Sequence, residues 1–157
     1  MDDQNDAGPE AVGDRRRPDS GDDIPDETAT VRRLYGAIPF HQAHDIEVLV
    51  ATPRYAEIKF PFDDNLVGNP DLDVLHGGVV STLIDLTGAA IFVGWCEDYT
   101  PTIDLRVNYL EAAGRRPLYG TAAIERRGAD IGVASVEVES GETVCATGTG
   151  VYKLTDD

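Results

Sequence analysis

Apolar and polar residues follow two different periods along this chain, and the change of period separates predicted helices from predicted strands. In residues 31–38 the apolar side chains recur at i, i+3, i+4 and i+7, the spacing of one face of a short helix. We expect this helix to begin at a threonine cap within 28–30 and to end at Pro39. Residues 46–52 and 55–62 alternate with a period of two, and because only two residues separate them they predict a hairpin.

The longest apolar stretch follows a polar segment. Residues 63–75 are rich in acids and amides and contain glycine and proline, so we expect a loop there. From Gly77 to Cys96 there is no proline, and apolar side chains fall on nearly every face of the helix that these residues predict. A helix that is apolar all round in a folded domain must be enclosed on most sides. We therefore expect this helix at the centre of the fold.

Alternating runs in the second half of the chain predict four more strands, at 102–110, 117–127, 131–139 and 143–154. Short turns with glycine join the last three strands, which indicates an antiparallel meander. The order of helix, two strands, long buried helix and four strands predicts an α+β fold. In this fold an antiparallel sheet is wrapped around one long buried central helix.

Charge limits the partners of the chain. Its 157 residues contain 29 acids against 13 lysines and arginines, a formal net charge of -16. Such a surface is repelled by phosphate backbones and by anionic membranes, so we expect neither nucleic acid nor a membrane as partner. Residues 1–27 hold many acids and few large apolar side chains, and we expect an acidic disordered tail there. The remaining residues, 28–157, are long enough for one domain with one core.

The kinds of charged residue and the cysteines indicate the salt content and the cellular location in which the protein works. Only Lys59 and Lys153 are lysines, and many acids with few lysines are typical of proteins from a salt-rich cytoplasm, where molar salt shortens the Debye length to ~3 Å. An ordinary acidic protein with a charged tail is the alternative. Cys96 and Cys145 lack the spacing of a disulfide framework or a metal knuckle, which favours a cytoplasmic location. We find no signal segment and no apolar run of about 20 residues for a membrane span.

One charged residue interrupts the predicted central helix. Asp85 lies between Ile84 and Leu86, and no other charged residue occurs from Gly77 to Cys96. Burying an ionised carboxylate without partners costs several kcal/mol, so this residue needs a compensating interaction or a function. Asp85 either faces a subunit interface or backbone amides, or it is a catalytic base or nucleophile whose environment adjusts its pKa.

The start of the same helix can receive an oxygen atom. In the segment His76-Gly77-Gly78, backbone N–H groups at the positive end of the helix dipole are not shielded by side chains at the two glycines. Such groups can polarise a carbonyl or bind an oxyanion. Asp85 is eight residues beyond Gly77, about 12 Å along the helix axis. One subunit cannot easily direct both groups at one atom, whereas two subunits with antiparallel helices can.

Two segments resemble a known family. The sequence LHGGVVSTLID at 75–85, followed by PTIDLRVNYL at 101–110, resembles the hot-dog-fold acyl-CoA thioesterases of the PaaI type, from phenylacetate degradation. The similarity covers residues 36–154, and a His-Gly-Gly with an Asp nine residues after the His is fairly specific within the hot-dog superfamily. It implies a homodimer or homotetramer with active sites between subunits, and hydrolysis of an aryl-, short- or medium-chain acyl-CoA. Coenzyme A is then part of the substrate, and no cofactor or metal is needed.

The resemblance also implies roles for individual residues. Asp85 matches the carboxylate that acts as general base on water or as nucleophile on the thioester. Gly77 matches the residue whose backbone N–H polarises the thioester carbonyl from the other subunit. Thr102 matches a Ser or Thr that hydrogen-bonds the carboxylate or the water. Asn69 is a candidate for the polar loop residue that holds substrate or water, although it stands one position too far from the histidine. His76 either orients its loop or contacts the thioester.

Other candidate groups are weaker. His41 and His44 are three residues apart, but no third ligand is in view and we expect no metal site. Coenzyme A is polyanionic, so an acidic protein must supply local cations. Arginines near predicted strand ends can supply these cations. Arg126 and Arg127 are the first candidates for contacts with the coenzyme A phosphates, and Arg115 and Arg116 are further candidates. The alternative for each is a surface residue without a ligand.

Thioester chemistry agrees with what the sequence lacks. A thioester carbonyl is electrophilic enough for one carboxylate and one or two amide donors to suffice. The chain has no Gly-x-Ser-x-Gly elbow, no P-loop and no dinucleotide fingerprint. Two alternatives remain open. One is a hot-dog enoyl-CoA hydratase or dehydratase that uses His76 and Asp85, and the other is a non-catalytic acyl-CoA-binding domain.

Overall fold

A computed structural model of the chain describes residues 26–154. Two helices at the start, α1 (Asp26–Gly36) and α2 (Pro39–Ala43), precede the hairpin of β1 (Glu47–Ala51) and β2 (Tyr55–Phe60). The remaining elements follow in this order: η2 (Asp64–Leu66), β3 (Val67–Asn69), β4 (Val74–Leu75), α3 (Gly77–Cys96), β5 (Thr102–Tyr109), β6 (Leu118–Arg127), β7 (Ile131–Ser140) and β8 (Thr143–Lys153).

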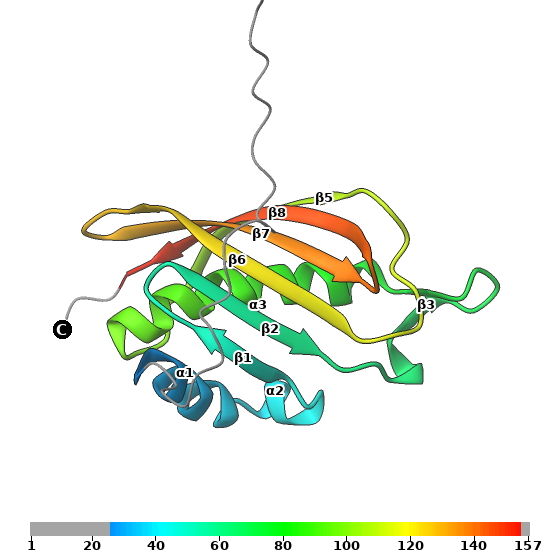
Figure 1. Cartoon of the computed structure of the whole chain (residues 1–157), viewed down its shortest axis with the longest axis horizontal. Helices are drawn as coiled ribbons and strands as arrows, with labels where there is room; N and C mark the ends of the chain where they lie inside the picture. The colour runs from blue at the N-terminus through cyan, green and yellow to red at the C-terminus, as the bar shows by residue number, and fades with distance from the viewer. Residues whose placement is uncertain (1–25, 155–157) are drawn as a thin grey trace, which may run out of the picture.

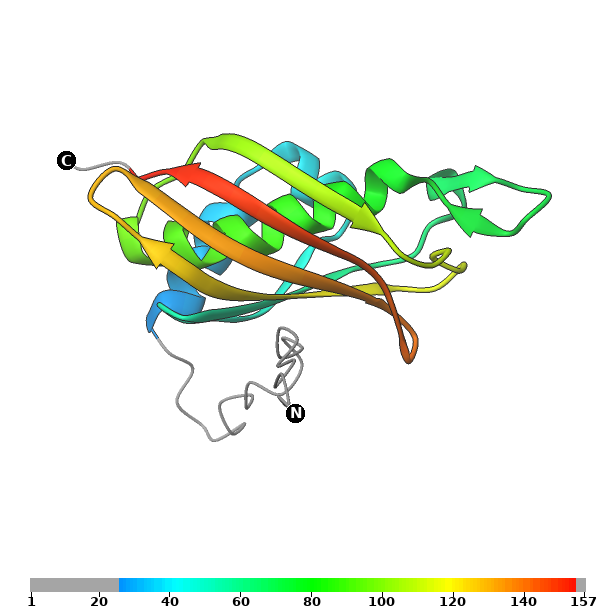
Figure 2. The ribbon, with the colours of Figure 1, turned by 90° about the horizontal axis from the view of Figure 1, so that it is seen from above.

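Six antiparallel strands form one sheet in the order β1-β2-β6-β7-β8-β5. The helix α3 lies along one face of this sheet and contacts all six strands, while α1 packs beside it (Figure 1). The predicted α+β arrangement of an antiparallel sheet around one long helix is confirmed, as is the meander of β6, β7 and β8. The strand β5 returns to pair with β8 and forms the edge of the sheet (Figure 2).

The central helix approaches the sheet closely because small residues leave room for one large side chain. Tyr152 of β8 is fully buried beneath α3, and its hydroxyl donates to the backbone carbonyl of Asp85 at 3.0 Å. A Cβ atom added at Gly88 of α3 or at Gly150 of β8 would overlap the Tyr152 hydroxyl. These two glycines therefore permit the hydrogen bond that holds the middle of α3 to the sheet.

Replacing Gly88 by alanine should destabilise the fold. Alanine improves helix propensity by about 1 kcal/mol, but its methyl group would displace Tyr152 from a closely packed site, at a cost of roughly 1–3 kcal/mol or more. We expect a net lower free energy of unfolding in chemical denaturation. Gly36→Ala is the matched control, because a Cβ at Gly36 meets nothing within 4 Å. Equal stability of the two variants would contradict this account.

Several local predictions were wrong. The first helix begins at Asp26 rather than at a cap within 28–30, and the Thr28 hydroxyl instead exchanges hydrogen bonds with the backbone of Ala51 on β1. The helix α1 ends at Gly36 rather than at Pro39, which is instead the first residue of α2, since proline fits the first turn of a helix. The expected loop at 63–75 contains η2 and the small β3–β4 hairpin. The predicted tail lies outside the described residues up to residue 25, and its last two residues belong to α1.

The helix α3 meets the length and hydropathy of a membrane-spanning segment, contrary to our expectation that no run of the chain would. Its 20 residues include a window with a mean hydropathy of 1.7. Most of that window is buried within the fold against the sheet and α1, and the core helix of a water-soluble protein passes the same test. The apolar character of α3 is thus accounted for by its place in the core.

Candidate functional site

The carboxylate of Asp85 meets the first residue of the sheet edge. Asp85 lies halfway along α3, and its Oδ1 accepts a hydrogen bond of 2.7 Å from the hydroxyl of Thr102, the first residue of β5. Asp85 is only partly buried and Thr102 is exposed. The pairing of β5 with β8 aligns Thr102 with Tyr152, which explains how a strand so far along the chain reaches this turn of α3. The Asp85 carboxylate and the Thr102 hydroxyl are therefore accessible from solvent at the free edge of the sheet.

The environment of Asp85 makes it a stronger base than an exposed carboxylate. Burial raises the pKa of Asp85, while the hydrogen bond from Thr102 and the nearby His41 each lower it. The net effect is a raised pKa. An ionised carboxylate with a raised pKa can accept a proton from water or attack an electrophile.

The sequence did not indicate that His41 lies near this carboxylate. His41 of α2 is buried, and its ring contacts Tyr35 edge-on at a centroid distance of 4.6 Å. Burial lowers the pKa of His41, and its Nδ1 has no hydrogen-bond partner among residues 26–154. These residues also contain no group of three His, Cys, Asp or Glu that could hold a metal. A lone histidine after a phenylalanine carries no pattern that would have revealed this position.

At the start of α3, most backbone donors are already used. His76 is the N-cap, and its Nδ1 accepts the N–H of Gly78 at 2.8 Å. Its carbonyl accepts the N–H of Val79 at 2.9 Å. The N–H of Gly77 finds no acceptor among the described residues. This leaves one donor at the positive end of a 20-residue helix, the arrangement that receives a carbonyl oxygen.

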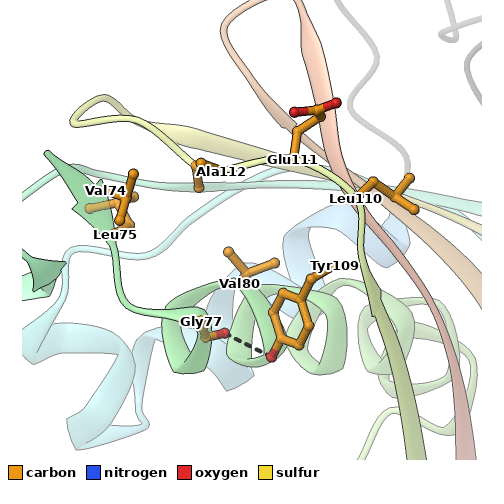
Figure 3. A pocket seen from close by; sticks show the side chains of 9 residues that line it. Val74, Leu75, Gly77, Val80, Tyr109, Leu110, Glu111 and Ala112 are labelled. Atoms are coloured by element: carbon orange, nitrogen blue, oxygen red, sulfur yellow. Dashed lines mark hydrogen bonds between the residues drawn. The ribbon is translucent and has the colours of Figure 1, made fainter. Parts of the chain in front are cut away.

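The backbone at Gly77 is also fixed from the other side. The hydroxyl of Tyr109, at the end of β5, donates to the carbonyl of Gly77 at 3.1 Å (Figure 3). A pocket of about 360 Å³ begins here, between β4, the first turn of α3 and the segment that follows β5. Sequence reasoning missed Tyr109, because the contact depends on where β5 ends relative to α3.

Gly77 and Asp85 are on the same helix, and eight residues separate them by about 12 Å along its axis. Within one chain, the structure brings Thr102 to Asp85 but leaves the free N–H of Gly77 more than two helix turns from Asp85. A second chain is the simplest way to bring the two kinds of group to one substrate atom.

The remaining candidates lie elsewhere. Asn69 is at the tip of the β3–β4 hairpin, where its Oδ1 accepts the N–H groups of Asp71 and Leu72. This hairpin projects from one end of the molecule (Figure 2). His76 has the capping role given above. In both residues the described contacts are those of local backbone structure.

The candidate arginines lie at the two ends of β6, and β7 and β8 separate this strand from β5. Arg126 and Arg127 end β6, three strands from β5, and Arg127 stacks over the ring of Trp95 with 4.6 Å between its guanidinium carbon and the ring centroid. Arg115 is paired with Asp64 and Asp73. Arg116 lies near Gly141 in the turn between β7 and β8. Within one chain, none of the four touches the Asp85 and Thr102 pair.

Comparisons with known proteins agree on one family. A sequence profile described as the thioesterase superfamily matches residues 72–147. The medium/long-chain acyl-CoA thioesterase YigI of Escherichia coli (strain K12) is 29% identical over 133 residues, which cover 74% of this chain and 86% of that protein. A protein of Halobacterium salinarum named "Putative esterase" is 30% identical over 124 residues, covering 71% and 82%. A Shewanella oneidensis crystal structure related to the thioesterase superfamily has a TM-score of 0.72 at 25% identity and covers 85% of this chain and 100% of that chain.

Proposed function

The chain belongs to the thioesterase superfamily and has its hot-dog fold, and on this premise we propose that it hydrolyses acyl-CoA thioesters to the free acid and coenzyme A. The observation that carries the proposal is the contact between Asp85 and Thr102 at the free sheet edge, with an unused N–H at Gly77. The proposed acyl groups are aryl groups or short to medium chains, as the resemblance implies. They overlap with the name of the relative YigI at the medium chains only.

We infer that two copies complete each site. The edge strand β5 is unpaired on its outer side in the described sheet. Large apolar side chains are exposed near its two ends, Ile103 and Tyr109 in the strand and Leu110 directly after it. Exposed apolar side chains on a free edge favour association with another chain. A second copy against this edge brings its Gly77 N–H to the Asp85 carboxylate of the first. Light scattering after size exclusion, in dilute buffer and in molar KCl, should give a dimer or a tetramer, and a monomer would contradict the shared site.

In the proposed reaction the Gly77 N–H donates to the thioester oxygen and stabilises the negative charge that develops there. Asp85 takes a proton from water as the water oxygen attacks the carbonyl carbon, or it attacks that carbon itself and forms an acyl anhydride that water then hydrolyses. Thr102 holds the carboxylate in place through its hydroxyl. The carbon–sulfur bond breaks, and the thiolate of coenzyme A leaves.

Arg126 and Arg127 remain the proposed contacts for the coenzyme A phosphates. Both are exposed, and neither has an ion-pair partner within residues 26–154. Arg126→Ala with Arg127→Ala should raise KM for acyl-CoA more than it lowers kcat.

The test of the function is a panel of aryl-, short-, medium- and long-chain acyl-CoA esters, assayed for free thiol in dilute buffer and in molar KCl. Release of thiol supports the proposal. Conversion of an enoyl-CoA to a hydroxyacyl-CoA without thiol release would instead identify a hydratase. Tight binding of the esters without turnover of any would identify a non-catalytic binding domain.

The pH dependence should report the carboxylate. The ionised form of Asp85 is the active one, so kcat/KM should fall as the pH drops through its pKa, with a midpoint above the ordinary value of 3.8 because burial raises this pKa. The groups around Asp85 are Thr102 of β5, His41 of α2 and the tyrosines Tyr35 and Tyr152. Thr102→Val removes a hydrogen bond that favours the charged form, and should move the midpoint to higher pH. Thr102→Ser keeps the hydroxyl, so its midpoint should stay at the wild-type pH. The same midpoint in both variants would refute the assignment of the titrating group to Asp85.

A further inference from the structure

We propose that Tyr109 determines which acyl chains the enzyme accepts, because its ring forms a wall of the apolar pocket that begins at Gly77. This inference deepens the proposed function and rests on it. It assigns the pocket to the acyl group of the substrate, rather than to coenzyme A.

The pocket is adjacent to the proposed carbonyl site. It has a volume of about 360 Å³, and Gly77 is one of the residues that line it. The side chains around it come from β4, α3 and the segment after β5, and most are aliphatic: Val74, Leu75, Val80, Leu110, Ala112 and Ala113. Figure 3 shows Tyr109 directed at Gly77, with Val80 beside them. A carbonyl bound by the Gly77 N–H therefore places one side of the thioester at this pocket.

The lining favours the acyl side of the thioester. Glu111 is the only charged residue among the lining residues, and no basic residue is present. Coenzyme A carries amides along its arm and phosphates at its far end, which an aliphatic wall with a carboxylate does not satisfy. An acyl chain gains from the same wall, since each buried methylene group raises affinity about fourfold. A pocket of this size is at the small end of ligand sites, so it limits the chain length.

Tyr109 is placed to set that limit. Its hydroxyl is held by the carbonyl of Gly77 at 3.1 Å, and its ring is in near contact with the Gly77 Cα, since an added Cβ would lie 3.3 Å from Cε1. The ring thus has a fixed position beside the proposed reacting carbonyl. Tyr109 is 57% exposed in the single chain, so shortening it removes no side chain from the core. Because Tyr109 also lies on the edge proposed to meet the second copy, the variants are compared with the wild type at the same oligomeric state, checked by light scattering.

Two variants separate the ring from the hydroxyl. Tyr109→Ala removes the wall, and Tyr109→Phe keeps the wall but loses the hydrogen bond to Gly77. We expect Tyr109→Ala to shift the kcat/KM profile over saturated esters, from butyryl- to palmitoyl-CoA, towards longer chains, by about fourfold for each additional methylene accommodated. Tyr109→Phe should keep the wild-type profile, with any loss of kcat equal at all chain lengths. The same profile in all three proteins would overturn the proposal.

Free coenzyme A distinguishes the two possible occupants. If the pocket holds the acyl chain, the inhibition constant for free coenzyme A should be the same in the wild type and in Tyr109→Ala. A weaker inhibition by coenzyme A in Tyr109→Ala, with an unchanged chain-length profile, would show that the pocket holds the coenzyme A arm. That result would overturn the acyl assignment and leave the proposed hydrolysis intact.

Binding measurements separate this inference from the proposed function. Calorimetry with Asp85→Asn, alone and combined with Tyr109→Ala, gives the affinity of each ester without turnover. A shift of preference to longer chains in the double variant supports the pocket even if the wild type hydrolyses none of the esters, in which case the hydrolysis proposal alone is wrong. Equal chain-length dependence of the two affinities would overturn the role of Tyr109.

Discussion

Asp85→Asn should lower kcat for acyl-CoA hydrolysis by about 10²–10⁴-fold, the contribution of a well-placed general base. Asparagine has nearly the same shape, and its side-chain oxygen can still accept the Thr102 hydroxyl that Asp85 accepts at 2.7 Å. The substitution therefore removes the basic and nucleophilic oxygen while the local structure stays. Thiol release under saturating substrate measures the effect.

Stability provides the check that the variant is folded. In the native state burial raises the pKa of Asp85 above its unfolded value, so ionisation of the group opposes folding. This unfavourable contribution is absent below the unfolded pKa, develops as the pH rises from the unfolded to the folded pKa, and is complete above the folded pKa. Asparagine does not ionise, so Asp85→Asn should be at least as stable as the wild type at pH 7, and the difference should disappear in acid.

The matched control is Asp98→Asn, at an exposed loop after α3. Within residues 26–154 the Asp98 side chain accepts the adjacent N–H of Tyr99, and asparagine keeps an oxygen for this hydrogen bond. Its activity should equal that of the wild type. Activity of Asp85→Asn within a few fold of Asp98→Asn would remove Asp85 from the mechanism.

A single turnover in ¹⁸O-labelled water tells the two roles of Asp85 apart. If Asp85 activates water, the label enters the product acid at once. If Asp85 attacks the thioester, it forms an acyl anhydride, and water opens this anhydride at the Asp85 carbonyl or at the acyl carbonyl. Attack of water at the Asp85 carbonyl leaves the label on the enzyme, and the product acid is then unlabelled. Label in Asp85 after one turnover, found by peptide mass spectrometry, would establish the nucleophilic route.

Gly77→Pro should lower kcat by about 10²–10³-fold relative to Gly77→Ala, which is the effect of removing one donor to a developing oxyanion. Gly77 is the first residue of α3, a position where proline is well tolerated because its missing N–H has no partner in the helix. The preceding His76 has φ of -63° and ψ of 135°, a conformation that proline permits before it. The substitution thus deletes the N–H and leaves the start of the helix in place.

Gly77→Ala is the control for the added side chain. Both variants place a Cβ near the Tyr109 ring, at 3.3 Å from Cε1, but alanine keeps the N–H. Circular dichroism should show the same helix content in both. Equal kcat for alanine and proline would mean that this N–H does not polarise the carbonyl.

Local patterns were enough to predict the elements but not their neighbours. The limits of α3 were predicted without error, because a run of twenty mostly apolar residues without proline is too long for one buried strand. The period of two located β1, β2 and the last four strands to within two residues at nearly every end. It did not show that β5 pairs with β8, because strand order depends on contacts between residues distant in the sequence.

The same limit applies to the site. Asp85 could be singled out from the sequence, because one charge on an apolar helix violates its pattern. The contacts of Tyr109 with Gly77, and the position of His41 near Asp85, depend on how β5 and α2 meet α3. Neither residue breaks the pattern of its own segment. Asn69 and His76 have polar contacts with adjacent backbone, which a one-dimensional motif cannot distinguish from contacts with a substrate.

Two tyrosines hold the helix turn that carries the carboxylate. Tyr152 donates to the carbonyl of Asp85 at 3.0 Å from the sheet side, and Tyr35 donates to the carbonyl of Leu86 at 2.7 Å from the side of α1. These carbonyl oxygens also belong to the hydrogen-bond ladder of α3, so each is an acceptor shared between a helix N–H and a tyrosine hydroxyl. The backbone under Asp85 is therefore anchored to two separate layers of the protein. A thioester that reacts at Asp85 therefore has to be aligned with a backbone that both layers hold in place.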